Sequence, residues 1–157
     1  MTTLLKRGAL ALVALLIFSS DAFAQSPVGM WRTIDDETGE PRSIVEIYEQ
    51  EGELFGKIVE ILPEGRSPIC DVCEGEYEGQ NLIGTVIVKG MERDGDEWED
   101  GTITDPKNGK TYNAKMSLSD PNTLDVRGFI KVPLMGSAIG RTQTWYRVAD
   151  DSMDTSM

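Results

Sequence analysis

The sequence predicts an all-β fold in which eight antiparallel strands run up and down in chain order and close into a barrel. After residue 24, helical periodicity is absent, and short runs rich in Val, Ile, Thr and aromatic residues recur instead. Most turns between these runs are too short to join parallel strands, which need a crossover of about a dozen residues. Closure into a barrel removes the exposed edges of such a sheet. A two-sheet sandwich fits the same pattern and is the alternative.

The N-terminal segment has the pattern of a cleavable export signal. Lys6 and Arg7 precede an apolar run at residues 8–18, and Ala22-Phe23-Ala24 places small residues where a signal peptidase reads them. The apolar run would span only about 17 Å as a helix, less than the roughly 30 Å of a bilayer core. We therefore expect cleavage before Gln25 and a mature protein without a membrane span, located in the periplasm or secreted.

The expected domain organisation is a signal peptide at 1–24, one barrel domain at 25–149 and a disordered acidic tail at 150–157. Removal of the signal changes the net charge from −12 to −13, because two basic residues and one acidic residue are lost. Such an acidic chain should be repelled by nucleic acid and by anionic membrane surfaces. The chain contains no His, so the commonest general base and metal ligand is missing. We expect no catalysis, no cofactor and no metal.

The first four strands are expected between residues 30 and 89. A tight turn at Glu51-Gly52 joins the second strand to the third. A long loop at 63–81, rich in Gly, Glu and Pro, separates the third from the fourth. The expected strands are Met30–Ile34, Ser43–Gln50, Glu53–Leu62 and Leu82–Lys89.

The last four strands are separated by turns at 93–96, 106–109 and 119–122 and by a loop that holds Pro133 and Gly136. The Asn-Gly pair in the second of these turns suits the positive φ angles of a type I′ hairpin. The expected strands are Glu97–Thr104, Lys110–Leu118, Thr123–Ile130 and Arg141–Val148.

Two strands show which side chains face the core. In the sixth, alternation puts Tyr112, Ala114, Met116 and Leu118 on one apolar face. In the seventh, Leu124, Val126, Gly128 and Ile130 share a face, with Asp125, Arg127 and Phe129 opposite.

Both ends of the domain carry residues that resemble the lipocalin-type (calycin) barrels. Gly29-Met30-Trp31 begins the first strand, and Trp145-Tyr146-Arg147 closes the last. The resemblance implies that Gly29, Trp31 and Arg147 close one end of the barrel, with the Arg147 guanidinium stacked on the Trp31 indole.

A wider series of motifs resembles a family of small secreted bacterial proteins, domain of unknown function 2147, over residues 28–148. This resemblance implies a lipocalin-like barrel in the Gram-negative periplasm, and it carries over no activity and no catalytic residue. The motifs are Gly29–Thr33, Gly39–Ile47, Gly56–Ile58, Cys70–Cys73, Gly101–Pro106, Asn108–Tyr112, Val126–Phe129 and Gly140–Trp145.

Cys70 and Cys73, the two cysteines of the chain, permit three interpretations. An oxidising compartment favours a structural disulfide that stiffens the long loop. A redox pair normally opens a helix, which the loop does not predict. A zinc site would need ligands from elsewhere, since four are usual. We favour the structural disulfide.

The charged clusters are better explained as turns than as sites. The segment 94–101 has oxygen ligands at alternate positions, but Glu99 stands where a calcium loop needs Gly. Asp105 suits a turn before Pro106 better than a catalytic role. Arg127 and Arg141 are candidates to bind a ligand carboxylate from inside the barrel, or to pair with surface acids.

The favoured function is non-enzymatic binding of a small apolar or amphipathic ligand inside the barrel. The candidate ligand contacts are Tyr112, Met116, Arg127, Phe129 and Trp145. The alternative is a filled barrel that recognises an envelope protein, and a carboxylate-dependent hydrolase is the third hypothesis. An interior packed by Trp98, Tyr112 and Met116 would argue against a ligand cup.

Overall fold

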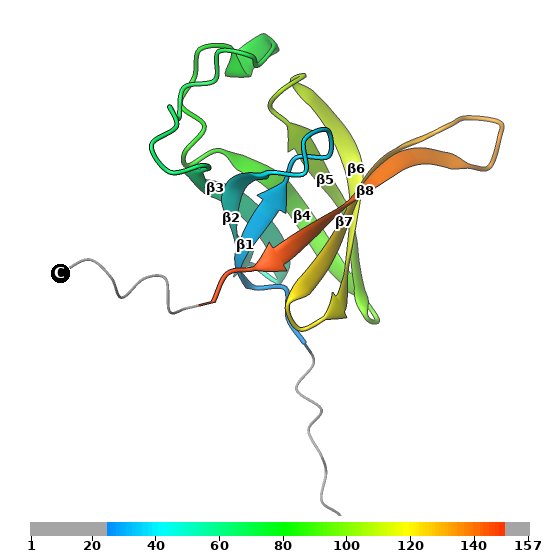
Figure 1. Ribbon diagram of the computed structural model, residues 1–157. Helices are drawn as coiled ribbons and strands as arrows, with labels where there is room; N and C mark the ends of the chain where they lie inside the picture. The colour runs from blue at the N-terminus through cyan, green and yellow to red at the C-terminus, as the bar shows by residue number, and fades with distance from the viewer. Residues whose placement is uncertain (1–24, 150–157) are drawn as a thin grey trace, which may run out of the picture.

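The structure is a closed barrel of eight antiparallel strands in chain order (Figure 1). The computed structural model describes residues 25–149, so the expected signal peptide and tail lie outside the described residues. The predicted barrel is confirmed, and the sandwich is wrong. The strands are β1 Gly29–Ile34, β2 Pro41–Gln50, β3 Glu53–Ile61, β4 Val86–Asp94, β5 Glu97–Asp105, β6 Lys110–Asp120, β7 Thr123–Lys131 and β8 Ala138–Arg147.

The strands pair unevenly around the barrel. β7 and β8 pair over nine positions, from Thr123 with Tyr146 to Lys131 with Ala138. β1 and β8, which close the barrel, pair at only two positions, Trp31 with Arg147 and Arg32 with Tyr146. The ladder between the first and last strands is therefore short and lies near the chain ends.

Two strands, β4 and β8, differ from the sequence prediction by more than two residues at an end, and β4 also ends at Asp94 rather than Lys89. β4 begins at Val86 rather than Leu82, because the preceding residues form a turn in which Thr85 N–H donates to the Leu82 carbonyl at 3.1 Å and Gly84 has a φ of 88°. β8 begins at Ala138 rather than Arg141, because pairing with β7 continues outward past the barrel wall. The long loop also holds a short 3-10 helix, η1 Gly75–Tyr77, that the sequence pattern did not predict.

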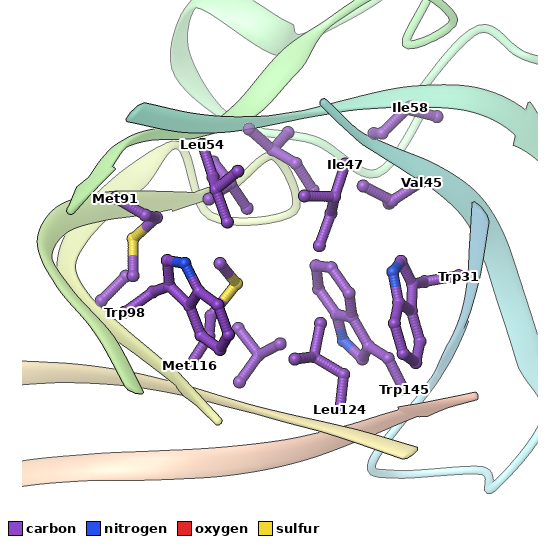
Figure 2. Packing of buried hydrophobic residues seen from close by; sticks show 14 residues of the cluster. Trp31, Val45, Ile47, Leu54, Ile58, Met91, Trp98, Met116, Leu124 and Trp145 are labelled. Atoms are coloured by element: carbon purple, nitrogen blue, oxygen red, sulfur yellow. The ribbon is translucent and has the colours of Figure 1, made fainter. Parts of the chain in front are cut away.

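The apolar core fills the half of the barrel in which β1 begins and β8 ends; Figure 2 shows its packing. Its three tryptophans come from β1, β5 and β8, and Met91 and Met116 fill the space between the walls. Full burial of one large apolar side chain contributes about 1.5–3 kcal/mol, so this cluster is the main source of stability. The buried residues are Trp31, Val45, Ile47, Leu54, Ile58, Ile87, Val88, Met91, Trp98, Ala114, Met116, Leu124, Val126 and Trp145.

A plug of backbone and side-chain contacts closes this end. The Arg147 guanidinium lies 4.3 Å from the Trp31 ring centroid, the cation–π contact that the lipocalin resemblance implied. The same guanidinium donates to three carbonyls that precede β1 or β7, those of Ser26, Val28 and Pro121, at 2.7–3.0 Å. Arg147 therefore joins the chain before β1 to the β6–β7 turn beneath the core.

Candidate functional site at the open end of the barrel

The inner wall changes character toward the opposite end of the barrel, which is formed by the β1–β2, β3–β4, β5–β6 and β7–β8 connections. In β6, Met116 and Ala114 are fully buried, whereas Tyr112, next on the same face, is partly exposed. Its cross-strand partner Ile103 is also partly exposed. Thr33 and Ser43 replace apolar side chains on the opposite wall, where their hydroxyls lie 2.8 Å apart. The interior is thus fully buried and apolar at one end, and less completely buried, with a mixed polar and apolar lining, at the other.

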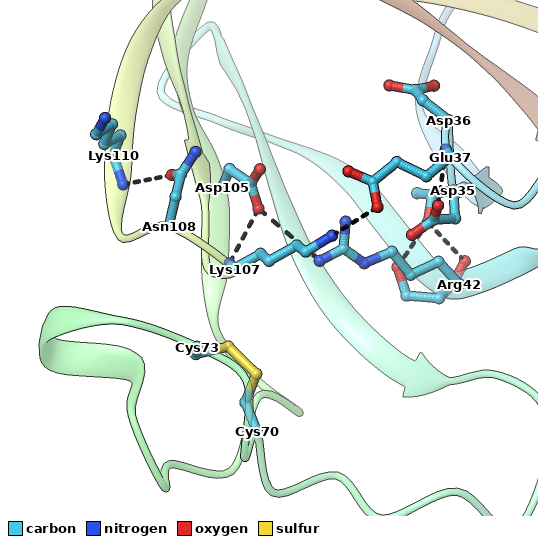
Figure 3. A network of polar contacts seen from close by, with 12 residues as sticks. Asp35, Asp36, Glu37, Arg42, Cys70, Cys73, Asp105, Lys107, Asn108 and Lys110 are labelled. Atoms are coloured by element: carbon cyan, nitrogen blue, oxygen red, sulfur yellow. Dashed lines mark hydrogen bonds and ion pairs between the residues drawn. A yellow bond between two sulfur atoms is a disulfide. The ribbon is translucent and has the colours of Figure 1, made fainter.

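Arg42 reaches across this open end (Figure 3). The β1–β2 register shifts between Thr33 and Ile34, so Arg42 is the extra residue of a β-bulge, a feature that redirects a side chain. Its guanidinium lies 3.8 Å from Asp105. Because β2 and β5 are three strands apart in an eight-stranded barrel, this loose ion pair connects facing walls.

A second ion pair spans the same opening. Lys107, in the β5–β6 turn, lies 3.2 Å from Glu37, in the β1–β2 loop (Figure 3). Exposed pairs of this kind contribute about 0–1 kcal/mol each, so both can open at low cost. The two pairs form a polar gate, which we define as Glu37, Arg42, Asp105 and Lys107.

Asp36 fixes one side of the gate to the last strand. One of its carboxylate oxygens lies 2.9 Å from Arg141 Nε and accepts a 3.0 Å hydrogen bond from the Gln143 side chain. These contacts hold the β1–β2 loop against β8 above the point where the β1–β8 ladder ends.

Asp35 and Asp105 each organise the turn that carries a gate residue. The Asp35 carboxylate accepts backbone hydrogen bonds from Thr38 at 3.0 Å and Glu37 at 2.9 Å, which lower the pKa of its carboxyl below the usual 3.8. Asp105 accepts the backbone N–H of Lys107 at 3.0 Å, which is the turn role that the sequence predicted. An ionised Asp35 therefore keeps the β1–β2 loop in shape.

The long loop packs beside the gate and carries a disulfide between Cys70 and Cys73 (Figure 3). Burial and a hydrogen bond to Glu76 raise the pKa of Tyr77, whose hydroxyl also contacts Thr104 on β5. Backbone of the loop lies against the β5–β6 turn as well, since a Cβ on Gly109 would come within 2.9 Å of the Glu74 carbonyl. The loop thus supports the turn that holds Asp105 and Lys107.

A shallow open groove of about 310 Å³ marks the place where β1 and β8 separate. It lies on the outside of the barrel, between the β1–β2 loop and the outer face of β8. Its lining residues are Ile34, Asp35, Asp36, Gly39, Thr142, Thr144 and Tyr146.

The structure separates the five candidate ligand contacts. Met116 and Trp145 are fully buried in the packed half, and Tyr112 lines the mouth. Arg127 and Phe129 lie on the outer face of β7, because Val126 and Gly128 pair with the inward-facing Met116 and Ala114. The prediction that Arg127 and Phe129 contact a ligand inside the barrel is therefore wrong.

Arg141 lies on the strand face that continues from Trp145 and Gln143, but its ionic partner is Asp36 rather than a group inside the barrel. Sequence reasoning missed Arg42 and Asp36. Arg42 is aimed by a bulge, and no composition signal in Gly39–Ser43 distinguishes a bulged arginine from an ordinary surface one.

The acidic segment weighed as a calcium loop forms the hairpin between β4 and β5. Across residues 25–149, no group of three carboxylates or cysteines gathers closely enough to hold a metal ion. In the same part of the chain, no helix is long and apolar enough to cross a bilayer.

A comparison with known families gives a match over residues 29–147, nearly the whole barrel. The family is described as uncharacterized protein conserved in bacteria (DUF2147). The chain belongs to this family. The match begins at Gly29 and ends at Arg147, so this family's unit is the closed barrel together with its plug. No curated protein matches the chain.

Among solved structures, the barrel is similar to protein HP1028 from the human pathogen Helicobacter pylori, which is described as belonging to the lipocalin family. The two share 17% sequence identity with a TM-score of 0.67, over 82% of this chain and 86% of the other. At this identity the likeness establishes the fold alone: this DUF2147 chain is a lipocalin-like barrel.

Proposed function

We propose that the protein is a non-enzymatic periplasmic binding protein that takes a small amphipathic molecule at the gated mouth of its barrel. The observation that carries the proposal is the position of the Arg42 guanidinium, which the bulge directs across the mouth of the barrel. Its ion pair with Asp105 is loose, because the two charged groups are 3.8 Å apart. A ligand carboxylate or phosphate that replaced Asp105 would offer this guanidinium a closer, bidentate partner.

The lining beneath the gate supports the amphipathic character of the ligand. Ile103 and Tyr112 offer apolar surface that solvent still reaches, and both pack against Gly128 of β7. The packed half below stops a long chain from passing through, since Val88, Met116 and Leu124 are fully buried there. We expect the ligand to be short or to leave part of its chain outside the barrel.

Periplasmic location is supported by the export-signal pattern of residues 1–24 and by the Cys70–Cys73 disulfide. A general acid or base works best when its pKa lies near the working pH. The chain has no His, and the pKa of Asp35 is lowered further from neutrality, so the residues of the gate give acid–base catalysis little support.

The test begins with native mass spectrometry of protein purified from the periplasm, to find a bound molecule that denaturation releases. Dodecanoate and dodecanol are then compared as probes, with NMR shifts of Ile103 and Tyr112 as the signal. We expect dodecanoate to bind more tightly, and Arg42→Gln to weaken it at least about tenfold, because a charged hydrogen bond is lost. Arg66→Gln, in the exposed long loop, is the matched control. Equal binding of both probes, or none, would contradict the proposal.

The packed half of the barrel favours a second candidate, recognition of an envelope protein by a filled barrel. Trp98 and Met116 are buried as that hypothesis requires, whereas Tyr112 is not. Crosslinking in intact cells separates the two: a stoichiometric protein partner together with a ligand-free native mass would favour recognition.

A further inference from the structure

The hairpin formed by the outer ends of β7 and β8 projects from the barrel wall (Figure 1). Pairing continues from Phe129–Gly140 through Ile130–Ile139 to Lys131–Ala138, and a short loop joins the strands. We define residues 129–140 as the projecting hairpin. At about 3.3 Å per residue, the extended segment from Phe129 to Val132 places the turn that carries Leu134 at least about 10 Å beyond the Phe129 pair.

The tip of the projecting hairpin is apolar and fully in water. Leu134 and Met135 have exposed fractions of 107% and 73%. Leu134 also has a φ of 72°, a left-handed conformation that costs a residue with a Cβ about 1–2 kcal/mol. Glycine would adopt this φ without that conformational free-energy cost. A leucine that keeps this conformation with its side chain in water is therefore best explained by an apolar partner that it contacts.

An apolar stripe joins this tip to the mouth. Ile130 and Ile139 are directly paired and exposed, and they share strand faces with Gly128 and Arg141. The stripe therefore continues the inner wall of the barrel out to Leu134.

The charge of this region is opposite to that of the chain. Residues 126–148 contain Arg127, Lys131, Arg141 and Arg147 and no Asp or Glu, although the chain has 27 acidic residues and a net charge of −12. Lys131 and Arg127 have no ionic partner among the described residues, whereas Asp36 engages Arg141. The tip lies farther from the acidic body than the screening length of about 8 Å at physiological salt, so that repulsion reaches it weakly.

We propose that the projecting hairpin docks the protein on a bilayer that contains anionic phospholipid. Leu134 and Met135 enter the boundary between headgroups and acyl chains, and Lys131 contacts a phosphate behind them. An apolar apex with a cation three residues behind it matches the layering of a membrane interface, where apolar residues sink about 5–10 Å. A protein partner would more often meet a broad surface with a polar rim than a narrow tip.

The test is flotation of the purified, cell-processed chain, its N-terminus established by mass spectrometry, with two kinds of vesicle. One is phosphatidylcholine alone, and the other is phosphatidylethanolamine mixed with phosphatidylglycerol. We expect flotation with the anionic vesicles, loss at high salt, and little flotation with phosphatidylcholine.

Variants locate the contact. Leu134→Ser with Met135→Ser should lower partitioning at least about tenfold, since two apolar side chains no longer leave water. Lys131→Glu should lower it about fivefold or more. Val72→Ser removes an equally exposed apolar residue, at 70%, from the long loop and should change nothing. All four side chains are exposed, so the unfolding temperature should stay the same and serves as the folding control.

Wild-type protein that floats with neither vesicle, or a Leu134/Met135 variant that floats as well as wild type, would overturn the proposal. A wild-type protein that forms dimers and binds no vesicles, with dimers lost in the same variant, would show that the tip contacts a second copy of the chain instead. Arg42→Gln should float normally, so failure of the ligand proposal and failure of membrane docking give different results.

Discussion

At the scale of single residues, Gly29 shows how tightly local geometry fixes the identity of a residue. Gly29 has a φ of 138°, and a Cβ there would stand 2.6 Å from Arg147 Nη1. That nitrogen also donates to the Val28 carbonyl, so it cannot move without losing a plug contact. The glycine of the Gly-x-Trp motif is therefore a requirement of the plug.

Gly29→Ala should destabilise the protein by about 1–3 kcal/mol, since it combines backbone strain with a displaced Arg147. Urea unfolding measures the loss. Gly39→Ala is the control, because Gly39 also has a positive φ, 72°, but its Cβ would meet open space. Equal losses in the two variants would show that Arg147 yields freely and that only backbone strain matters.

Asp35 gives the β1–β2 loop a dependence on acid. Its pKa is lowered in the folded protein by the Thr38 and Glu37 backbone hydrogen bonds, so it stabilises the fold above pH 3.8, and this contribution is lost as pH falls through the lowered pKa. Asp35→Ala should therefore be less stable than wild type at pH 7, with the difference shrinking as the pH falls below 3.8. A difference that stays constant with pH would show that the Asp35 charge does not matter.

At the scale of elements, the sequence predicted the strands and the tight turns well, and the side-chain contacts between loops poorly. Alternation located six of the eight strands to within two residues at each end, because one face of each is buried. The start of β4 was misplaced because Leu82–Thr85 is apolar enough for a strand, although Gly84 turns the chain there. The gate could not be predicted, since its pairs join side chains far apart in the sequence, Arg42 with Asp105 at 63 positions and Glu37 with Lys107 at 70.

The disulfide belongs to the same scale. Cys70 and Cys73 close a ring only three residues apart, so replacing both by Ser should cost about 2 kcal/mol or less. We expect the effect to be local, with faster amide exchange in residues 70–80 and an unchanged barrel. Hydrogen exchange measured by NMR reports both. Loss of protection throughout β5 and β6 would instead make the loop part of the cooperative core.

At the scale of the whole molecule, one end of the barrel is densely packed and the other is more exposed. The three tryptophans and two methionines that fill the core half leave little room to vary, whereas Thr33 and Ser43 place small hydroxyl side chains on the wall of the other half. The sequence could indicate which residues face inward, because successive side chains of a strand point to opposite faces. The same pattern continues along the whole strand, so it could not indicate how far along the barrel axis the interior is filled.

This division predicts unequal costs for truncating inward-facing residues. Met116→Ala should destabilise the barrel by about 2–5 kcal/mol, because the cavity it leaves is enclosed. Ile103→Ala should cost clearly less, because solvent already reaches that side chain. Thermal unfolding of both variants tests this, and a larger loss at Ile103 would mean that the mouth is closed.

The two-pair ladder between β1 and β8 ties completion of the fold to the arrival of the chain's last residues. Trp31 has no partner strand on one side until Arg147 is present, so a ribosome-bound chain still lacking its end cannot finish its native structure. A barrel that its final strand must close therefore stays incompletely folded until that strand has been made, which suits the export to the periplasm that we propose.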